Sequence, residues 1–310
     1  MPETILLTGA TGFLGSHLLE ALLARGYQVV ILKRSFSDTW RINHLLNRVK
    51  SYDLDRDATG KAFKDQQIDV VIHLATYYRK FDSGEKISEM FNANVAFPVE
   101  LIEHGIRHGL KGFINTGTFF EYDCKILPVK EDTPIKPFNL YAKTKIAFEN
   151  ILKTYSERIY TTTLRLFSPY GEKDNAKLIP IIIQKALKEE SIELSDGLQK
   201  LDFIYSKDIV SAYLKVLEHV SDFSRVHQVF NIGSGFPTSV REVVSILEQQ
   251  LKFPIKKIWG KPSKTDIPIV FADITKAKKQ LGWAPIYSIQ QGLEMTIKYY
   301  KDEERIEQWK

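Results

Sequence analysis

The fold of this chain is decided by residues 4–35, TILLTGATGFLGSHLLEALLARGYQVVILKRS. The apolar runs Ile5–Leu7 and Val29–Leu32 have the length and composition of buried strands. Between them, residues 17–24 carry apolar side chains at helical spacing, and Gly26 marks the end of that helix. The segment therefore predicts the order strand, turn, helix, strand.

The turn between the first strand and the helix contains three glycines. Gly9, Gly12 and Gly15 form the pattern G-x-x-G-x-x-G within GATGFLG. Glycines at this spacing let the backbone turn tightly and approach a pyrophosphate, while the helix directs its positive end at the phosphates. We expect an α/β fold with a Rossmann-type doubly wound parallel sheet that binds a dinucleotide. The alternative is a tight turn that serves packing alone.

The second strand ends in two cations and a hydroxyl, Lys33, Arg34 and Ser35, and residues 29–37 contain no Asp or Glu. In a dinucleotide fold an acidic residue at this point accepts from the ribose 2′-hydroxyl of NAD, whereas a cation accommodates the 2′-phosphate of NADP. A guanidinium binds a phosphate with two parallel hydrogen bonds. The strand end therefore favours NADPH/NADP, with NAD as the alternative if these are ordinary surface cations.

The bulk composition excludes several classes of protein. The 310 residues are 44% hydrophobic, and a net charge of +5 is dispersed over 43 basic and 38 acidic residues. This balance is too mild for a nucleic-acid partner, and no apolar run is long enough for a membrane span, so we expect a cytoplasmic protein. Cys124 is the single cysteine, which excludes an intrachain disulfide and a cysteine-based metal cage. We expect an incidental free thiol there, rather than a nucleophile, and no metal site.

Further motifs follow in order along the chain. They are Asp53-Leu54, VVIHLAT (70–76), NTGTFFEYD (115–123), NLYAKTK (139–145), LRLFSPYG (164–171), LDFIYSKDIV (201–210), FNIGSG (230–235) and LGWAP (281–285). Together with the glycine pattern they resemble the extended short-chain dehydrogenase/reductase family that acts on nucleotide sugars, also called the NAD-dependent epimerase/dehydratase family. The apolar residues after Thr118 and the basic strand end look most like CDP-abequose and CDP-paratose synthases.

The resemblance carries several expectations. It implies a Rossmann domain from residues 1–166 plus about 203–233, and a smaller C-terminal nucleotide-sugar-binding lobe from about 167–202 plus 234–310. It implies NADPH-dependent reduction of the 4-keto group of a CDP-4-keto-3,6-dideoxyhexose, for the sugars of surface polysaccharides such as O-antigen. It also implies a homodimer, paired through two helices that include the one bearing the catalytic residues.

Tyr141 and Lys145 are spaced as Y-x-x-x-K, which places both side chains on one helix face, a turn apart. An ammonium group beside a phenol lowers the phenol pKa, so we expect Tyr141 to exchange a proton near neutral pH. The resemblance makes these two residues catalytic and adds Thr118, counted back from Tyr122-Asp123, as a hydroxyl on the reacting oxygen. Thr116, on the same strand face, is the rival for that role.

The residues after Thr118 separate the reactions of the family. Sugar-nucleotide 4,6-dehydratases carry an Asp-Glu pair where this chain has Phe119 and Phe120, which cannot transfer protons. A dehydratase is therefore not expected. An NAD-dependent 4-epimerase stays open, because such enzymes use the same Thr, Tyr and Lys. A non-catalytic dinucleotide sensor is disfavoured, because Tyr141 and Lys145 are both present.

The resemblance also assigns the binding residues. The dinucleotide set is Gly9, Thr11, Gly12, Phe13, Leu14, Gly15, Lys33, Arg34, Ser35, Asp53, Leu54, Leu74, Ala75, Thr76, Asn94, Thr116, Tyr141, Lys145 and Phe167. The nucleotide-sugar set is Tyr77, Thr118, Phe119, Phe120, Ser168, Lys177, Leu178 and Lys200.

Two arginines that pair with the substrate diphosphate in many relatives are missing here. Leu201 stands at the first position. Residues 262–264, shortly before Asp266 where the second is expected, are Pro, Ser and Lys. Lys177, Lys200 and Lys264 are candidate replacements, although each lacks the bidentate fork of arginine. The alternative for each is a solvated surface cation.

Overall fold

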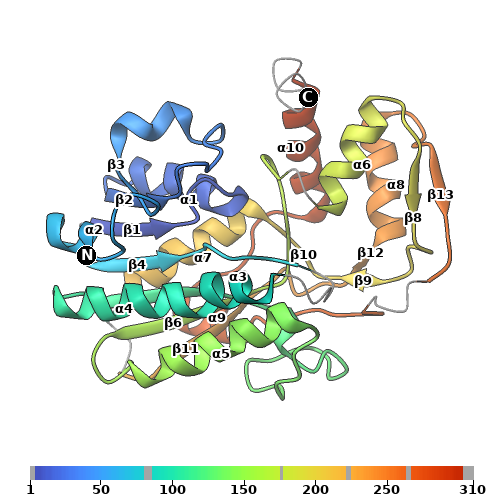
Figure 1. The fold of residues 1–310 in the computed structure, drawn as a ribbon. Coiled ribbons are helices and arrows are strands. Elements are labelled where there is room, and N and C mark those ends of the chain that lie inside the picture. The colour runs from blue at the N-terminus through green and yellow to red at the C-terminus, as the bar shows by residue number, and fades with distance from the viewer. Residues whose placement is uncertain (1–3, 80–85, 175–176, 221–224, 263–266, 303–310) are drawn as a thin grey trace.

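The structure is a computed structural model that describes residues 4–79, 86–174, 177–220, 225–262 and 267–302. Lys264 and Asp266 lie outside these residues. Figure 1 shows a sheet covered by helices and, beside it, a smaller group of helices and short strands from the C-terminal half of the chain.

Seven parallel strands form the central sheet in the order β11-β6-β5-β4-β1-β2-β3. Their bounds are β1 Thr4–Thr8, β2 Gln28–Lys33, β3 Lys50–Asp53, β4 Val70–His73, β5 Gly112–Thr118, β6 Tyr160–Leu166 and β11 Gln228–Ile232. The central strands are runs of Val, Ile and Leu because both faces of a parallel sheet are covered. The order reverses direction between β1 and β4, where a doubly wound sheet has its ligand crevice. The predicted fold class is confirmed.

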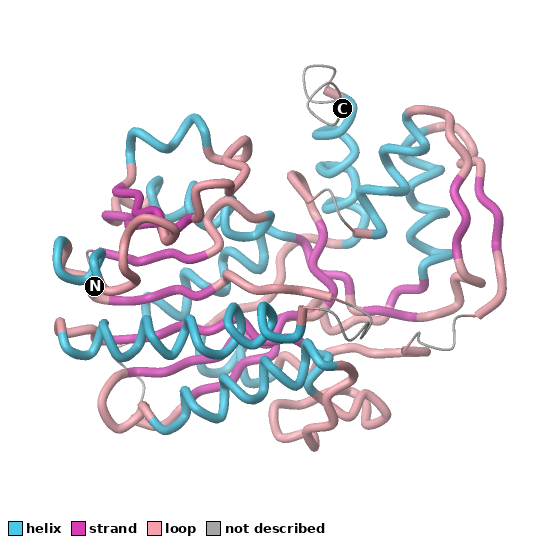
Figure 2. The backbone as a smooth tube through the Cα atoms, in the orientation of Figure 1, coloured by secondary structure: helices cyan, strands magenta, loops and turns pink. Residues whose placement is uncertain are grey.

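Helices cover both faces of the sheet (Figure 2). Leu18 and Leu22 of one helix and Tyr213 of another pack in a large apolar cluster on one face. Leu101 and Phe148 belong to the cluster on the other face. The helices and single turns around the sheet are α1 Phe13–Ala24, η1 Asn43–Arg48, α2 Lys61–Asp65, α3 Ile87–Phe91, η2 Asn92–Ala96, α4 Phe97–Arg107, η3 Phe119–Glu121, α5 Leu140–Thr154, α7 Ser206–His219 and α9 Thr275–Leu281.

The C-terminal group has an apolar cluster of its own, which includes Ile182, Val243 and Leu293. Its elements are β7 Ser168–Tyr170, α6 Leu178–Leu187, β8 Ile192–Leu194, β9 Lys200–Leu201, β10 Phe203–Tyr205, β12 Thr238–Ser239, α8 Val240–Leu251, β13 Lys257–Trp259 and α10 Ile289–Lys301. Ser239 and Ser288 cap α8 and α10 through capping boxes, which explains where these helices begin. The residue boundaries between the two lobes stay a prediction.

Asp202, between β9 and β10, joins three segments that are distant in the sequence. Its fully buried carboxylate accepts hydrogen bonds from the Ser234 N–H (2.6 Å) and hydroxyl (2.6 Å), the Gly235 N–H (3.0 Å) and the Ala272 N–H (2.9 Å). These bonds hold the turn after β11 and the segment before α9 against the strand junction. Burial raises the pKa of Asp202, and the four donors oppose that rise.

We predict that Asp202→Ala lowers the free energy of unfolding by about 3 kcal/mol, because one buried and two half-buried backbone donors lose their acceptor. Asp132→Ala is the matched control. Asp132 is exposed, so its loss should change stability by less than about 0.5 kcal/mol. Urea denaturation followed by circular dichroism measures both, and equal stabilities of the two variants would contradict the structural role of Asp202.

Candidate active site

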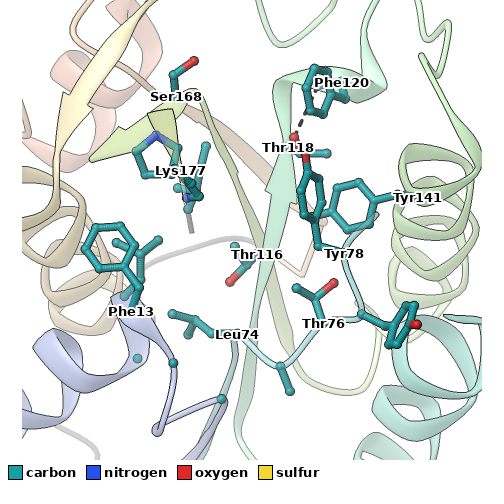
Figure 3. Close-up of a pocket in the computed structure, with 18 of the residues that line it drawn as sticks. Phe13, Leu74, Thr76, Tyr78, Thr116, Thr118, Phe120, Tyr141, Ser168 and Lys177 are labelled. Atoms are coloured by element: carbon teal, nitrogen blue, oxygen red, sulfur yellow. Dashed lines mark hydrogen bonds between the residues drawn. The ribbon is translucent and has the colours of Figure 1, made fainter. Parts of the chain in front are cut away.

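A cavity of about 1600 Å³ opens at the carboxyl ends of the sheet strands. The sheet side contributes the glycine turn after β1 and the ends of β2, β4 and β5, and the C-terminal group contributes residues such as Lys177 and Leu201. Figure 3 shows Phe13, Ser168 and Lys177 on one side of this cavity, opposite Thr118, Phe120, Tyr78 and Tyr141. The cavity therefore lies where a doubly wound sheet places its ligand.

The backbone around the glycine turn is packed so closely that Gly9 and Gly15 have no space for a side chain. Gly9 has φ +71°, and a Cβ there would lie 2.7 Å from the Ala75 nitrogen; a Cβ at Gly15 would lie 2.0 Å from the Gly9 carbonyl oxygen. The Gly12 N–H donates to that carbonyl at 2.9 Å. Within the described chain no side chain caps α1, so its first N–H groups face the cavity and fit the pyrophosphate of a dinucleotide.

The basic end of β2 lies beside two carboxylates. Lys33 and Arg34 line the cavity, but Ser35 donates its hydroxyl to Asp53 (2.7 Å) and its backbone N–H to Asp55 (2.7 Å). The Ser35 hydrogen bond lowers the pKa of Asp53. Asp53 ends β3, which pairs with β2 so that Lys33 stands opposite Asp53, and Asp55 follows two residues later. Both carboxylates lie outside residues 29–37, the segment on which the NADPH expectation was based.

Tyr141 and Thr118 both line the cavity. Tyr141 lies in the first turn of α5, whose start is fixed by Asn139 accepting the Ala142 N–H at 2.9 Å. Thr118 is the last residue of β5. Lys145 lies one turn beyond Tyr141 and is 2% exposed. The Tyr78 ring packs edge-on against Tyr141, with 4.9 Å between the ring centroids.

Burial decides the direction in which the pKa values of Tyr141 and Lys145 shift. Burial raises the pKa of Tyr141, the negative charge of Glu121 raises it further, and hydrogen bonding to Thr76 opposes the rise. Burial also lowers the pKa of Lys145 to about 8, against the opposing effect of Glu121 and Glu149. The expectation that Tyr141 exchanges a proton near neutral pH is wrong for the chain itself, because burial raises the pKa of its phenol.

Thr116 and Thr118 differ in how their hydroxyls are used. The Thr116 hydroxyl donates to the His73 carbonyl at 2.8 Å and lies 2.6 Å from the Tyr213 hydroxyl. The Thr118 hydroxyl accepts a long hydrogen bond from the Phe120 N–H at 3.4 Å. A hydroxyl held by strong bonds to the protein is less able to serve a reacting group, so the geometry favours Thr118.

Asn94 supports the loop that follows β4. It is fully buried in η2, where its side-chain oxygen accepts from the Tyr77 N–H (2.7 Å) and the Thr76 hydroxyl (3.0 Å). Its nitrogen donates to the Tyr77 carbonyl (3.1 Å) and the Thr144 hydroxyl (3.0 Å). Asn94 therefore fixes the position of this loop against α5.

The structure brings most of the predicted residues to one cavity. Those that line it are Gly9, Thr11, Gly12, Phe13, Leu14, Gly15, Lys33, Arg34, Leu54, Leu74, Ala75, Thr76, Thr116, Tyr141 and Phe167 of the dinucleotide set and Tyr77, Thr118, Phe119, Phe120, Ser168, Lys177 and Leu178 of the sugar set. Those outside the lining are Ser35, Asp53, Asn94, Lys145 and Lys200. Lys200 is exposed, whereas its neighbour Leu201 lines the cavity at the position of the missing arginine.

Four residues at or behind the cavity were not predicted from the sequence. Glu193 and Gln199 line it, and Glu121 and Arg165 form a buried ion pair behind it. A signal for that pair was present, since Glu121 directly follows Phe119 and Phe120, and Arg165 lies between Leu164 and Leu166. Charged residues are almost never fully buried without a partner.

A sequence model described as "NAD dependent epimerase/dehydratase family" matches residues 5–233. The chain belongs to this family. It is 32% identical to a CDP-abequose synthase of Salmonella muenchen over 95% of this chain and 97% of that protein. It is 31% identical to a putative UDP-glucose 4-epimerase of Methanocaldococcus jannaschii, over 97% and 99% of the two chains.

Solved structures of the family have the same fold. The UDP-glucose 4-epimerase of Thermotoga maritima with UDP-glucose has a TM-score of 0.87 at 27% identity, covering 97% of this chain and 99% of that chain. A UDP-glucuronic acid 4-epimerase of Bacillus cereus, in complex with UDP-glucuronic acid and NAD, has a TM-score of 0.86 at 28% identity, covering 99% and 100%. The matches therefore include more than one reaction of the family.

Three further observations concern the part of the chain that the structure describes. None of its helices combines the length and the apolar character needed to cross a membrane. No three His, Cys, Asp or Glu side chains of these residues are grouped so that they could hold a metal ion. Cys124 is a free, half-buried cysteine, and burial raises the pKa of its thiol to about 12, which does not suit a nucleophile.

We predict that Gly15→Ala weakens binding of nicotinamide dinucleotides at least about tenfold, because a methyl group there displaces the glycine turn from α1. The control is Gly26→Ala. Gly26 has a positive φ of +82° but meets no neighbour within 4 Å, so only backbone strain of about 1 kcal/mol is expected. Fluorescence titration with NADPH and NADH gives the affinities, and unchanged affinity in Gly15→Ala would count against a phosphate loop.

Proposed function

We propose that this chain is a cytoplasmic, homodimeric NADPH-dependent 4-ketoreductase of a nucleotide-linked deoxysugar, of the CDP-4-keto-3,6-dideoxyhexose type, for surface polysaccharide sugars. The observation that carries the proposal is the pairing of Tyr141 and Thr118 with Phe119 and Phe120 in one cavity. The side chains after Thr118 that line this cavity cannot abstract a proton from the sugar, which disfavours elimination of water.

A nicotinamide dinucleotide, when bound, would supply the hydride. The glycine turn and the open end of α1 fit its pyrophosphate. The raised pKa of Tyr141 keeps the phenol protonated at neutral pH, so its hydroxyl can donate a proton to the carbonyl oxygen as that oxygen becomes an alcohol. Thr118 donates a hydrogen bond to the same oxygen. The Lys145 ammonium, buried one turn away, stabilises the tyrosinate left behind.

The similarity to a CDP-abequose synthase supports the reductase part of the proposal. The CDP-abequose synthase of Salmonella muenchen is similar over almost the whole chain. A non-catalytic dinucleotide sensor finds no support, because Thr118 and Tyr141 line one cavity and Lys145 lies one turn beyond Tyr141.

The second candidate is an NAD-dependent nucleotide-sugar 4-epimerase. Asp53 and Asp55 accept hydrogen bonds from Ser35, so negative charge stands beside the basic end of β2. That charge opposes a 2′-phosphate and favours the free ribose of NAD. The similarity to UDP-glucose 4-epimerases points the same way.

The deciding experiment mixes the protein with NADPH or NADH and with CDP-, dTDP-, GDP- and UDP-linked 4-keto sugars, and follows reduced-cofactor absorbance. We expect stoichiometric oxidation of NADPH with one 4-keto-deoxysugar. Tyr141→Phe should lower turnover at least about 100-fold while NADPH still binds. Interconversion of a nucleotide sugar with no net oxidation, or NAD that copurifies with the protein, would establish the epimerase instead.

The cofactor preference has its own test. Arg34→Ala should weaken NADPH binding about tenfold or more and NADH binding less than about twofold, because only NADPH carries the 2′-phosphate that a guanidinium binds. Lys50→Ala is the control, since Lys50 is an exposed cation at the start of β3. Equal losses for NADPH and NADH in Arg34→Ala would remove the basis for NADPH preference.

A further inference from the structure

Glu121 is a fully buried carboxylate directly behind the cavity. It ends the single turn η3, and its Oε1 accepts the backbone N–H of Thr118 at 2.8 Å. This bond and the bond from the Phe120 N–H to the Thr118 hydroxyl fix Thr118 at the end of β5. Glu121 therefore contacts the residue whose hydroxyl faces the reacting oxygen in the proposed function.

The second oxygen of Glu121 lies in a buried ion cluster. Its Oε2 is 2.7 Å from Arg165 Nε, and Arg165 Nη2 is 2.7 Å from Oε1 of Glu149. Glu149 also pairs with Lys153 at 3.0 Å, and the Lys153 side chain is 44% exposed. Arg165 is thus shared by two buried carboxylates, and Lys153 is the second cation paired in this cluster. Lys145, 2% exposed, lies one turn before Glu149 on α5.

The ion pair of Glu121 and Arg165 packs so closely against β5 that Gly117 has no space for a side chain. A Cβ at Gly117, the residue before Thr118, would lie 2.8 Å from Arg165 Cγ and 3.1 Å from Glu121 Oε1. The ion pair therefore lies directly against β5. This pair acts on Thr118, which lines the cavity, through the β5 backbone as well as through its charge.

Ionisable groups from four segments face Glu121 or its partners. They are Tyr141, Lys145, Glu149 and Lys153 on α5, Arg165 on β6, Tyr122 after η3, and His227 before β11. Burial raises the pKa of Glu121 to about 7, against the opposing effect of Arg165, so Glu121 is ionised above that pH. Its charge then favours the protonated forms of both Lys145 and Tyr141, and Glu149 acts in the same sense on Lys145. For Lys145, Glu121 is the larger of these two influences.

We propose that Glu121 is a positioning residue of this site: its hydrogen bond holds Thr118, and its buried negative charge keeps Lys145 protonated. The effect on turnover rests on the proposed function, but the effect on Lys145 does not. Removing the charge favours neutral Lys145, so the proton should leave Lys145 at a lower pH than in the unaltered chain. A structural role alone would change stability and leave this titration where it is.

The first test uses neither substrate nor cofactor. The protein is labelled with lysine carrying 13C at Cε, the Lys145 signal is assigned by its absence in Lys145→Met, and its chemical shift is followed with pH. In Glu121→Gln the midpoint should fall by about one pH unit from its value of about 8. Glu149→Gln is the matched control, because it neutralises a buried carboxylate on the same Arg165 and should shift the midpoint less. An unmoved midpoint in Glu121→Gln, or an equal shift in both variants, would overturn the proposal.

The second test measures turnover with the substrate that the panel identifies. Glu121→Gln keeps an oxygen for the Thr118 N–H, so KM should stay within about twofold while the alkaline limb of the kcat profile moves to lower pH with Lys145. Glu121→Met removes both functions and should lower kcat about a further tenfold. An unmoved alkaline limb in a folded Glu121→Gln protein would refute the role of the charge. If no substrate is turned over, the proposed function fails while the titration still decides the role of Glu121.

Discussion

The close approach of three backbone segments at Gly9 is the constraint on which the rest of the site depends. A Cβ at Gly9 would collide with Ala75, so the glycine turn fixes the point at which the chain leaves β4. From there Thr76 and Tyr77 are held by Asn94, and Asn94 is bonded to Thr144 on α5. That helix carries Tyr141. The position of the tyrosine relative to the phosphate loop is therefore set by a continuous series of short hydrogen bonds and one steric contact.

Local sequence patterns were sufficient for the features that depend on local spacing. The glycine pattern, the apolar strands and the pair Tyr141 and Lys145 each lie within a single segment, and the fold class followed from them. Features that depend on pairing between distant segments could not be predicted. Asp53 lies beside Ser35 only because β3 pairs with β2 in one register, and Asn94 lies behind Tyr77 only after η2 packs on α5. The pKa of Tyr141 belongs to the same group, because spacing brings a lysine nearby but burial decides the direction of the shift.

The buried charges behind the cavity favour a defined geometry more than they favour stability. Taking two carboxylates and a guanidinium out of water costs much of what their mutual attraction returns. Their value lies in orientation: Arg165 is held by Glu149 and Glu121, and its guanidinium lies 4.4 Å over the Tyr122 ring. A cluster with so few alternative arrangements gives the end of β5 a single backbone conformation.

The order in which these charged residues are synthesised also bears on how the sheet forms. Arg165 is made after Glu121, Tyr122 and Glu149, so the two carboxylates and the ring that contact its guanidinium are already available when β6 emerges. The other edge of β6 has a different history, because its neighbour β11 is synthesised only after α6, the short strands β8 to β10 and α7. Until β11 is made, β6 is therefore open along one edge, and an open strand edge can pair with another nascent chain.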